Sequence, residues 1–286
     1  MDNSNEPTRP SPKLDRDDAP SHSLACEEVW GGNHIVNLTV EVPGFMGWVY
    51  SRPLEPATSG GDVYYLSSCS KGLLSRVVIA DVAGHGQAVS ASAMTLRRLL
   101  RDHMNDLDQS HLMREMNEEF HRMDDPDEVQ YATAAVLSYF CPTSELIFTN
   151  AGHPAALWYH APEKVWGCLS EDTPYSQSRM EGVPLGLIPG TDYMQSAVRL
   201  SDGDLLLLYS DGISESTNAA GIELGYEGLL SMARTLPEQA TKSSATAGQA
   251  LLSLVRSYRG SAVSFDDQSL IVLQQTAENM KAYARP

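Results

Sequence analysis

Four aspartates stand where short β-prone runs of this sequence end or turn, in positions where carboxylates could bind metal ions. Asp62 follows two glycines in GGD, Asp81 lies in IADVAGHG, Asp211 in LLLLYSDG and Asp266 in FDDQS. An Asp beside Gly is also a common turn signal, so each position taken alone predicts a turn or a cap. Carboxylates gathered at one sheet edge would repel one another unless a cation lay between them, and Mg²⁺ and Mn²⁺ prefer such oxygen ligands. The repetition therefore predicts a divalent-metal site.

The segments that carry these aspartates have the pattern of short strands interrupted by helices. Strand-like runs rich in Val, Ile, Tyr and Leu are IVNLTVEV, FMGWVYS, VYYLSS, RVVIADV, YATAAVLSYF, ELIFTNAG, AALWYH, GDLLLLYSDG and SLIVLQ. Apolar residues at three- and four-residue spacings predict helices over 87–106, 111–123, 226–234 and 247–258. Consecutive short strands favour antiparallel sheets, and the order of elements favours a single α+β domain.

The predicted domain organisation is a polar tail followed by one domain. Residues 1–24 are rich in Pro, Ser and Asp and predict a disordered tail, because they cannot bury enough apolar surface. Residues 25–280 form the single predicted domain. The segment 162–182 has no strong periodicity and is expected to be a long surface excursion.

Composition limits the classes of function. Of the 286 residues, 20 are Lys or Arg and 37 are Asp or Glu, giving a net charge of −17, which argues against a general nucleic-acid binder. No stretch has the length of a signal peptide core or a membrane span. The cysteines form no CxxC pair and none begins a CxxxxxR loop, so they are expected to be free thiols in the cytoplasm. They are Cys26, Cys69, Cys141 and Cys168.

Several motifs in series resemble one enzyme family. GGDVYY, IADVAGHG, a strand with Thr133, TNAGHP, GVPLG, LLLLYSDGISE and FDDQS follow in the order typical of the bacterial RsbU/SpoIIE branch of the PPM, or protein phosphatase 2C-like, metal-dependent serine/threonine phosphatases. The resemblance runs from about Gly60 to Leu273. It implies a sandwich of two antiparallel sheets flanked by helices, with two Mn²⁺ or Mg²⁺ ions at one end.

The resemblance also assigns roles to residues. Asp81 would bridge the two ions, with the carbonyl of Val82 as a further ligand, and Asp62, Asp211 and Asp266 would complete the set. The family pattern Asp, any, any, Ser/Thr selects Asp266 rather than its neighbour Asp267. Asp62, Asp81 and Asp211 are thereby the expected catalytic carboxylates.

Two histidines near these motifs are further candidates. The catalytic histidine of eukaryotic relatives follows the bridging aspartate at the position of Ala83 here. His85 is displaced by two residues, so it either serves as an acid for the leaving oxygen or fixes its loop by a hydrogen bond. His153, with Asn150 and Gly152, is expected to fix the turn between two strands.

The activity implied is hydrolysis of phosphoserine or phosphothreonine by a metal-activated water, without a covalent phosphoenzyme. The implied substrate is an anti-sigma-factor antagonist of the STAS type in a bacterial partner-switching pathway. The helices over 87–124 are a candidate surface for an activating regulator, and membranes are not expected partners.

Two other readings remain open from the sequence. A phosphatase-like module could bind a phosphoprotein without turnover, although the four carboxylates argue against it. A small-molecule phosphoesterase could use the same metals, and assays on phosphopeptides against sugar phosphates or nucleotides would distinguish the two enzymes.

Overall fold

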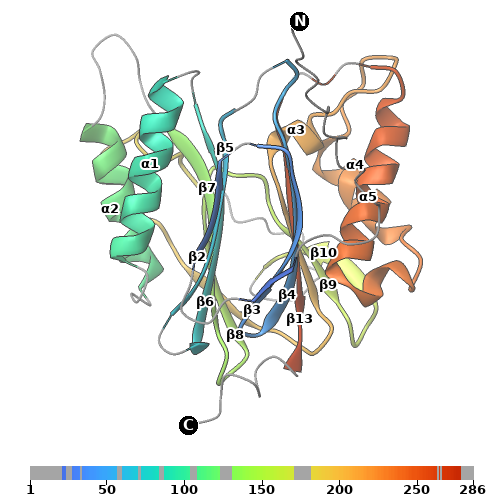
Figure 1. Cartoon of the computed structure of the whole chain (residues 1–286), viewed down its shortest axis with the longest axis horizontal. Helices are drawn as coiled ribbons and strands as arrows, with labels where there is room; N and C mark the ends of the chain where they lie inside the picture. Colours follow the sequence, from blue (N-terminus) through green and yellow to red (C-terminus); the bar gives the residue numbers. More distant parts are fainter. Residues whose placement is uncertain are drawn as a thin grey trace, which may run out of the picture.

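Two facing β-sheets with helices on their outer sides make up this protein (Figure 1). The computed structural model describes residues 21–23, 28–32, 34–56, 60–69, 72–83, 87–103, 108–122, 131–170, 182–262, 264 and 266–277. The neighbouring strands pair antiparallel, apart from the parallel pair β1–β3. The predicted α+β sandwich of two antiparallel sheets is confirmed.

Within the described residues, one sheet has seven strands and the other has six. The first has the order β1 (Ser21–Ser23), β3 (Val36–Val42), β4 (Phe45–Arg52), β13 (Gln268–Gln275), β12 (Leu205–Tyr209), β9 (Leu157–His160) and β10 (Val165–Cys168). The second has the order β11 (Ser196–Arg199), β8 (Glu145–Ala151), β7 (Ala132–Phe140), β6 (Leu74–Val82), β5 (Asp62–Cys69) and β2 (Glu28–Gly32).

Helices cover the outer face of each sheet (Figure 1). The six-stranded sheet carries α1 (Gln87–Asp102) and α2 (Gln109–Arg122), and the seven-stranded sheet carries α4 (Gly225–Arg234) and α5 (Ser244–Arg259). Two shorter helices are α3 (Asp211–Ser214) and the 3₁₀ turn η2 (Ala240–Lys242). None of the described helices is long and apolar enough to cross a membrane.

The strand β6 is buried on both faces along nearly its whole length, which explains its run of apolar residues. In β6, Val77 and Ile79 belong to the core between the sheets, whereas Val78 and Ala80 pack in the layer with α1 and α2. Successive side chains of a strand point to opposite faces, so one strand serves two cores. The four acidic segments emerge from this rigid frame.

The structure corrects two expectations. The expected surface excursion 162–182 contains β10, which pairs with β9 and buries Trp166 and Cys168, so its first part belongs to a sheet. The rest, 171–181, lies outside the described residues. In the expected tail 1–24, Ser21–Ser23 forms β1, and the other residues lie outside the described ones.

Candidate metal centre

Asp62 and Asp81 lie directly opposite each other on neighbouring antiparallel strands. Asp62 begins β5, Asp81 is the penultimate residue of β6, and the two are register partners. Asp62 is only 2% exposed, and its Oδ2 accepts a 2.7 Å hydrogen bond from Ser210 Oγ. Burial raises the pKa of Asp62 well above its usual value, and the charge of Asp81 adds to the effect. Two carboxyls so placed favour a shared cation.

The charges of carboxylates from other segments affect the pKa of Asp81. Burial is the main cause that raises the pKa of Asp81 to about 7, followed by the charges of Asp211 and Asp266. Asp267 and Glu215 contribute further. Because like charges at short range disfavour ionisation, this pKa indicates that acidic side chains from β6, α3 and the segment before β13 share one region.

Asp211 stands at the junction of β12 and α3. The strand ends at Tyr209 and the helix begins at Asp211, where the sequence predicted a turn. Burial, then the charge of Asp266, raises the pKa of Asp211. The backbone oxygen of Asp211 accepts a 2.6 Å hydrogen bond from Glu215 N, which closes the helical turn.

Ser210 joins three of the acidic segments and was missed by the sequence reasoning. Its backbone N donates to Ser269 O at 3.0 Å, and Ser269 N donates to Ser210 Oγ at 2.9 Å. The same hydroxyl donates to Asp62. Ser210 thus connects the end of β12 with the starts of β13 and β5, and only its place beside Asp211 in SDG could have indicated this role.

The adjacent residues Asp266 and Asp267 have different environments. Asp267 is 8% exposed, and its two carboxylate oxygens accept hydrogen bonds from Leu54 N at 2.7 Å and Gly61 N at 2.8 Å. Asp266 is exposed, and its Oδ1 accepts from Asp267 N at 2.8 Å. Asp267 therefore holds the loop before β5, which leaves Asp266 as the better candidate ligand.

Because Gly61 has no side chain, there is space beside it for oxygen atoms of Asp81 and Val82. A Cβ at Gly61 would lie 2.7 Å from Asp81 Oδ1 and 2.7 Å from Val82 O. The backbone N of Val82 donates to Gly61 O at 3.1 Å, which keeps the two segments together. The predicted ligand pair, Asp81 carboxylate and Val82 carbonyl, therefore lies over a residue without a side chain.

The donor set has the chemistry of a hard divalent cation site. Every candidate ligand is a carboxylate or carbonyl oxygen, which Mg²⁺ and Mn²⁺ prefer. Within the described part of the chain, no three Asp, Glu, His or Cys side chains are close enough to hold one ion together. The carboxylates form a loose acidic group at one end of the sandwich, and the oxygen chemistry of this group fits divalent cations.

The turn after β8 is built as a closed hydrogen-bonded unit. Asn150 Nδ2 donates to His153 O at 2.8 Å, and His153 N donates to Asn150 Oδ1 at 2.8 Å. Gly152 has φ +71°, a conformation that glycine adopts without strain. His153 Nδ1 lies 2.9 Å from Thr133 Oγ1, and burial lowers the pKa of this histidine to about 3. These residues form part of the frame beneath the acidic group.

His85 and the cysteines are the remaining residues considered in the sequence analysis. His85 lies outside the described residues, as do its neighbours in 84–86. Cys141 and Cys168 are buried free thiols, and burial raises the pKa of Cys141 to about 12. A thiol in this state is a poor nucleophile.

The two-sheet sandwich flanked by helices has the protein phosphatase 2C-like fold. The family model for stage II sporulation protein E (SpoIIE) matches residues 74–276. The chain belongs to the SpoIIE family, and the predicted resemblance to the RsbU/SpoIIE branch is confirmed.

Two curated relatives come from Bacillus subtilis (strain 168). The phosphoserine phosphatase RsbP is 27% identical over 146 residues, covering 49% of this chain and 33% of RsbP. The phosphoserine phosphatase RsbU is 23% identical over 163 residues, covering 56% of this chain and 44% of RsbU. The matched part thus spans less than half the length of either relative.

Solved structures with low sequence identity share the fold. RsbX in complex with magnesium has a TM-score of 0.61 at 14% identity, with 84% of this chain and 100% of RsbX covered. The catalytic domain of the serine/threonine protein phosphatase PstP, in complex with two manganese ions, has a TM-score of 0.55 at 15% identity, with 81% and 98% covered.

Proposed function

We propose that this protein is a metal-dependent protein-serine/threonine phosphatase that uses two divalent cations, Mn²⁺ or Mg²⁺. The observation that carries the proposal is the meeting of Asp62 and Asp81 in register, in the electrostatic field of Asp211 and Asp266. RsbP and RsbU, which share part of this sequence, are phosphoserine phosphatases, and RsbX and PstP share the fold and bind magnesium and manganese.

These carboxylates would supply most of the ligands of the two ions. Asp81 would bind both ions, the backbone carbonyl of Val82 would add a further ligand, and Asp62, Asp211 and Asp266 would complete the ligand set. When bound, such a pair of ions supplies an activated water and neutralises charge on the phosphoryl group.

Other residues of the chain position these ligands. Ser210 donates to one oxygen of Asp62 and so fixes the direction in which its carboxylate faces. Asp267 ties the segment before β5 to the segment before β13 through its bonds to Leu54 and Gly61. The neutral His153 and its turn support β7 and β8 behind the site.

The proposed substrate is a phosphorylated STAS-type anti-sigma-factor antagonist in a partner-switching pathway. The two B. subtilis relatives support the choice of a phosphoserine substrate. No covalent phosphoenzyme is required, in agreement with the buried state of Cys141 and Cys168.

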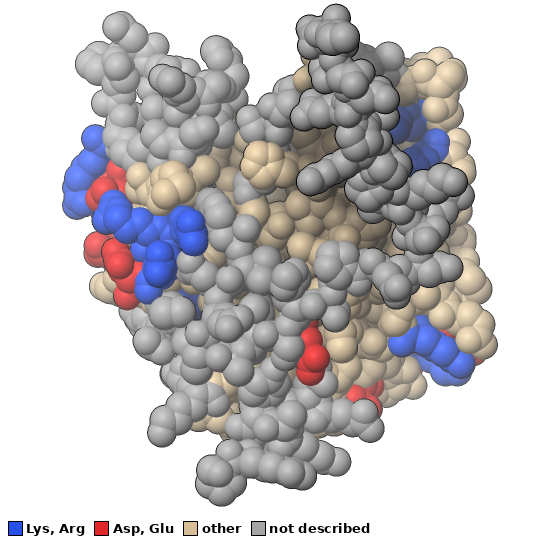
Figure 2. All heavy atoms as spheres, in the orientation of Figure 1, with Lys and Arg blue, Asp and Glu red and all other residues tan. Residues whose placement is uncertain are grey.

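The outer face of α1 and α2 is proposed to receive an activating regulator. Figure 2 shows basic and acidic side chains close together on this face, and Arg98 joins the two helices through a 2.7 Å ion pair with Glu119. Arg98→Ala is expected to change activation by a regulator while metal binding stays as in the wild type. If Arg98→Ala and further alanine variants on this face change neither property, the regulatory role is wrong.

The test of the function is phosphate release from a phosphoserine STAS-type protein, with Mn²⁺ titrated in and chelator added back. We expect turnover that depends on the metal, is abolished by chelator and is lost in Asp211→Asn. Mn²⁺ binding by calorimetry on both proteins supplies a second readout. A wild-type protein that is folded and binds Mn²⁺ but releases no phosphate from any phosphoprotein would favour either a binding module or an enzyme that requires its activating regulator.

A further inference from the structure

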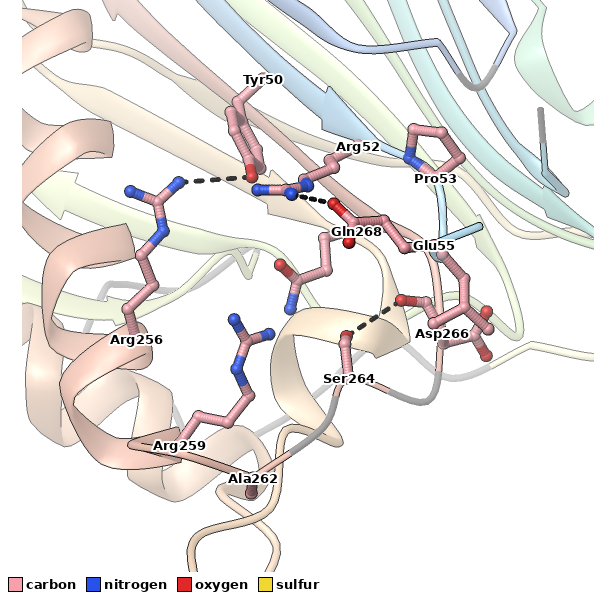
Figure 3. A pocket seen from close by; sticks show the side chains of 11 residues that line it. Tyr50, Arg52, Pro53, Glu55, Arg256, Arg259, Ala262, Ser264, Asp266 and Gln268 are labelled. Carbon is pink, nitrogen blue, oxygen red and sulfur yellow. Dashed lines mark hydrogen bonds and ion pairs between the residues drawn. The ribbon is translucent and has the colours of Figure 1, made fainter. Parts of the chain in front are cut away.

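A pocket of about 200 Å³ lies beside Asp266, between the end of β4 and the last turn of α5 (Figure 3). Arg52, Arg256, Arg259 and Gln268 line it together with Asp266. Figure 3 shows the Arg256 and Arg259 side chains entering the pocket from α5, opposite Asp266. A basic pocket thus adjoins a proposed metal ligand.

The three arginines have different interaction partners. Arg52 forms an ion pair with Glu55 at the rim. Arg256 donates a 3.3 Å hydrogen bond to the hydroxyl of Tyr50 and lies 5.7 Å from the centre of its ring. None of the ion pairs formed among the described residues involves Arg256 or Arg259. Within this described part of the chain, two guanidinium groups therefore face the pocket without an ion pair to a carboxylate.

A structural role at the helix end accounts for only part of this arrangement. Arg256 and Arg259 occupy the last turn of α5, where positive charge interacts favourably with the helix dipole. That interaction requires no particular direction of the side chains. Residues three apart share one face of a helix, and here that face is the one turned to Asp266.

The opposite side of Asp266 has the opposite charge. A second pocket of about 240 Å³ shares Asp266 and Ser264 with the first and is lined by Glu215 and Glu223. The charge of Glu223 contributes to raising the pKa of Glu215, after burial and Asp211. An anionic group beside the proposed metal site would thus be attracted on the α5 side and repelled on the α3 side.

We propose that Arg256 and Arg259 form a subsite for the carboxylate of an acidic residue close to the phosphoserine of the protein substrate. The inference rests on the proposed function, because it places the phosphoserine at Asp266. The pocket, at about 200 Å³, has room for an acidic side chain, and guanidinium groups bind carboxylates through charge-assisted hydrogen bonds. The chain would thereby prefer phosphoserine in an acidic context on one side.

The experiment uses phosphoserine peptides that carry a single Glu at each position from three before to three after the phosphoserine, in an alanine background. On the wild-type protein with Mn²⁺, we expect one Glu position to lower KM about tenfold relative to the peptide without Glu, with little change in kcat. Arg259→Ala and Arg256→Ala should reduce this ratio to about one. Arg259→Lys should keep part of it.

A matched control and a charge exchange separate recognition from stability. Arg199→Ala removes an exposed arginine from β11 on the other sheet and should leave the Glu preference unchanged. Arg259→Glu should reverse the preference in favour of a peptide with Lys at the same position. A Glu preference that survives in both alanine variants, or its absence from the wild type, would overturn the proposal.

Equilibrium binding keeps this test separate from the proposed function. Fluorescence anisotropy of the labelled peptides measures the Glu preference without turnover. If the wild type binds the Glu peptide more tightly through Arg259 but hydrolyses neither peptide nor p-nitrophenyl phosphate, the subsite stands and the phosphatase assignment fails. If it hydrolyses the peptides without preference and binds them equally, the subsite fails alone.

Discussion

Asp62 and Asp81 face each other as direct partners across β5 and β6, one almost fully buried and the other half-buried. Like charges directly opposite one another destabilise a sheet. Burial and the charge of Asp81 raise the pKa of Asp62, whereas burial and the charges of Asp211 and Asp266 raise the pKa of Asp81. The pair is therefore expected to destabilise the metal-free fold, which agrees with a role for the pair in binding cations.

Neutralising Asp81 should stabilise the metal-free protein and remove its response to metal. The folded-state pKa of Asp81 is about 7, above its usual 3.8. Between these two pH values, the folded protein therefore holds a proton on Asp81 that the unfolded chain has lost. Stability thus falls as the pH rises from about 4 to 7. After allowance for partial exposure, we expect Asp81→Asn to gain about 2 kcal/mol at pH 7.5 in chelator, and much less at pH 4.5.

Urea denaturation at the two pH values, with chelator and then with Mn²⁺, measures both effects. Asp192→Asn, at an 84% exposed side chain far along the sequence, is the matched control and should change stability by only a few tenths of a kcal/mol. Equal stability of Asp81→Asn and wild type in chelator at pH 7.5 would count against the repulsion inferred here.

Asp266 and Asp267 should respond differently to the same substitution. Asp267→Asn replaces a buried carboxylate oxygen that accepts from the Leu54 or Gly61 amide, so we expect a loss of about 1 to 3 kcal/mol in unfolding free energy. Asp266→Asn, at an exposed side chain, should keep the fold and weaken Mn²⁺ binding. Thermal unfolding and calorimetric Mn²⁺ titration of both variants distinguish the roles, and the reverse pattern would make Asp267 the ligand.

Gly212 should tolerate no side chain. A Cβ there would lie 1.9 Å from Asp267 O, so Gly212→Ala forces apart the loops that carry Asp211 and Asp266. Gly221→Ala is a useful control because a Cβ added at this position would have nothing within 4 Å. Placing alanine at the φ of +74° found here costs about 1 kcal/mol. We expect Gly212→Ala to lose clearly more stability than Gly221→Ala and to bind Mn²⁺ more weakly, as thermal unfolding and calorimetry would show.

The long elements were predictable because their patterns are local. The helix expected over 226–234 is α4 (Gly225–Arg234), and that over 247–258 lies within α5 (Ser244–Arg259). In contrast, β10 and β11 have four residues each and gain their stability from partners in β9 and β8. Four residues are too few to show a period, so the segment 162–182 was expected to be a surface excursion.

Motif order in the sequence is enough to propose the acidic residues of the candidate site, but it does not indicate the contacts that hold these residues in place. Motif order indicated Asp62 and Asp81, whereas the bond from Ser210 to Asp62 spans 148 positions in sequence and leaves no local signal. The same holds for Arg256, which meets Tyr50 across 206 positions. Contacts of this kind depend on how the two sheets and α5 come together in the complete fold.

His153 should make the protein sensitive to acid. Burial lowers its pKa from 6.5 to about 3 in the folded state, so below pH 6.5 the unfolded chain takes up a proton that the folded protein does not. The contribution of the neutral His153 to the free energy of unfolding is therefore complete above pH 6.5, and it falls by up to about 1.4 kcal/mol per pH unit as the pH drops toward 3.

His153→Gln should be less stable at pH 7 but should show a shallower loss of stability between pH 6 and 4. Thr133→Val removes the hydroxyl 2.9 Å from His153 Nδ1 and keeps the imidazole, so it should retain the wild-type steepness. Urea denaturation across this pH range tests the difference, and equal slopes for His153→Gln and the wild type would show that other groups control the acid response.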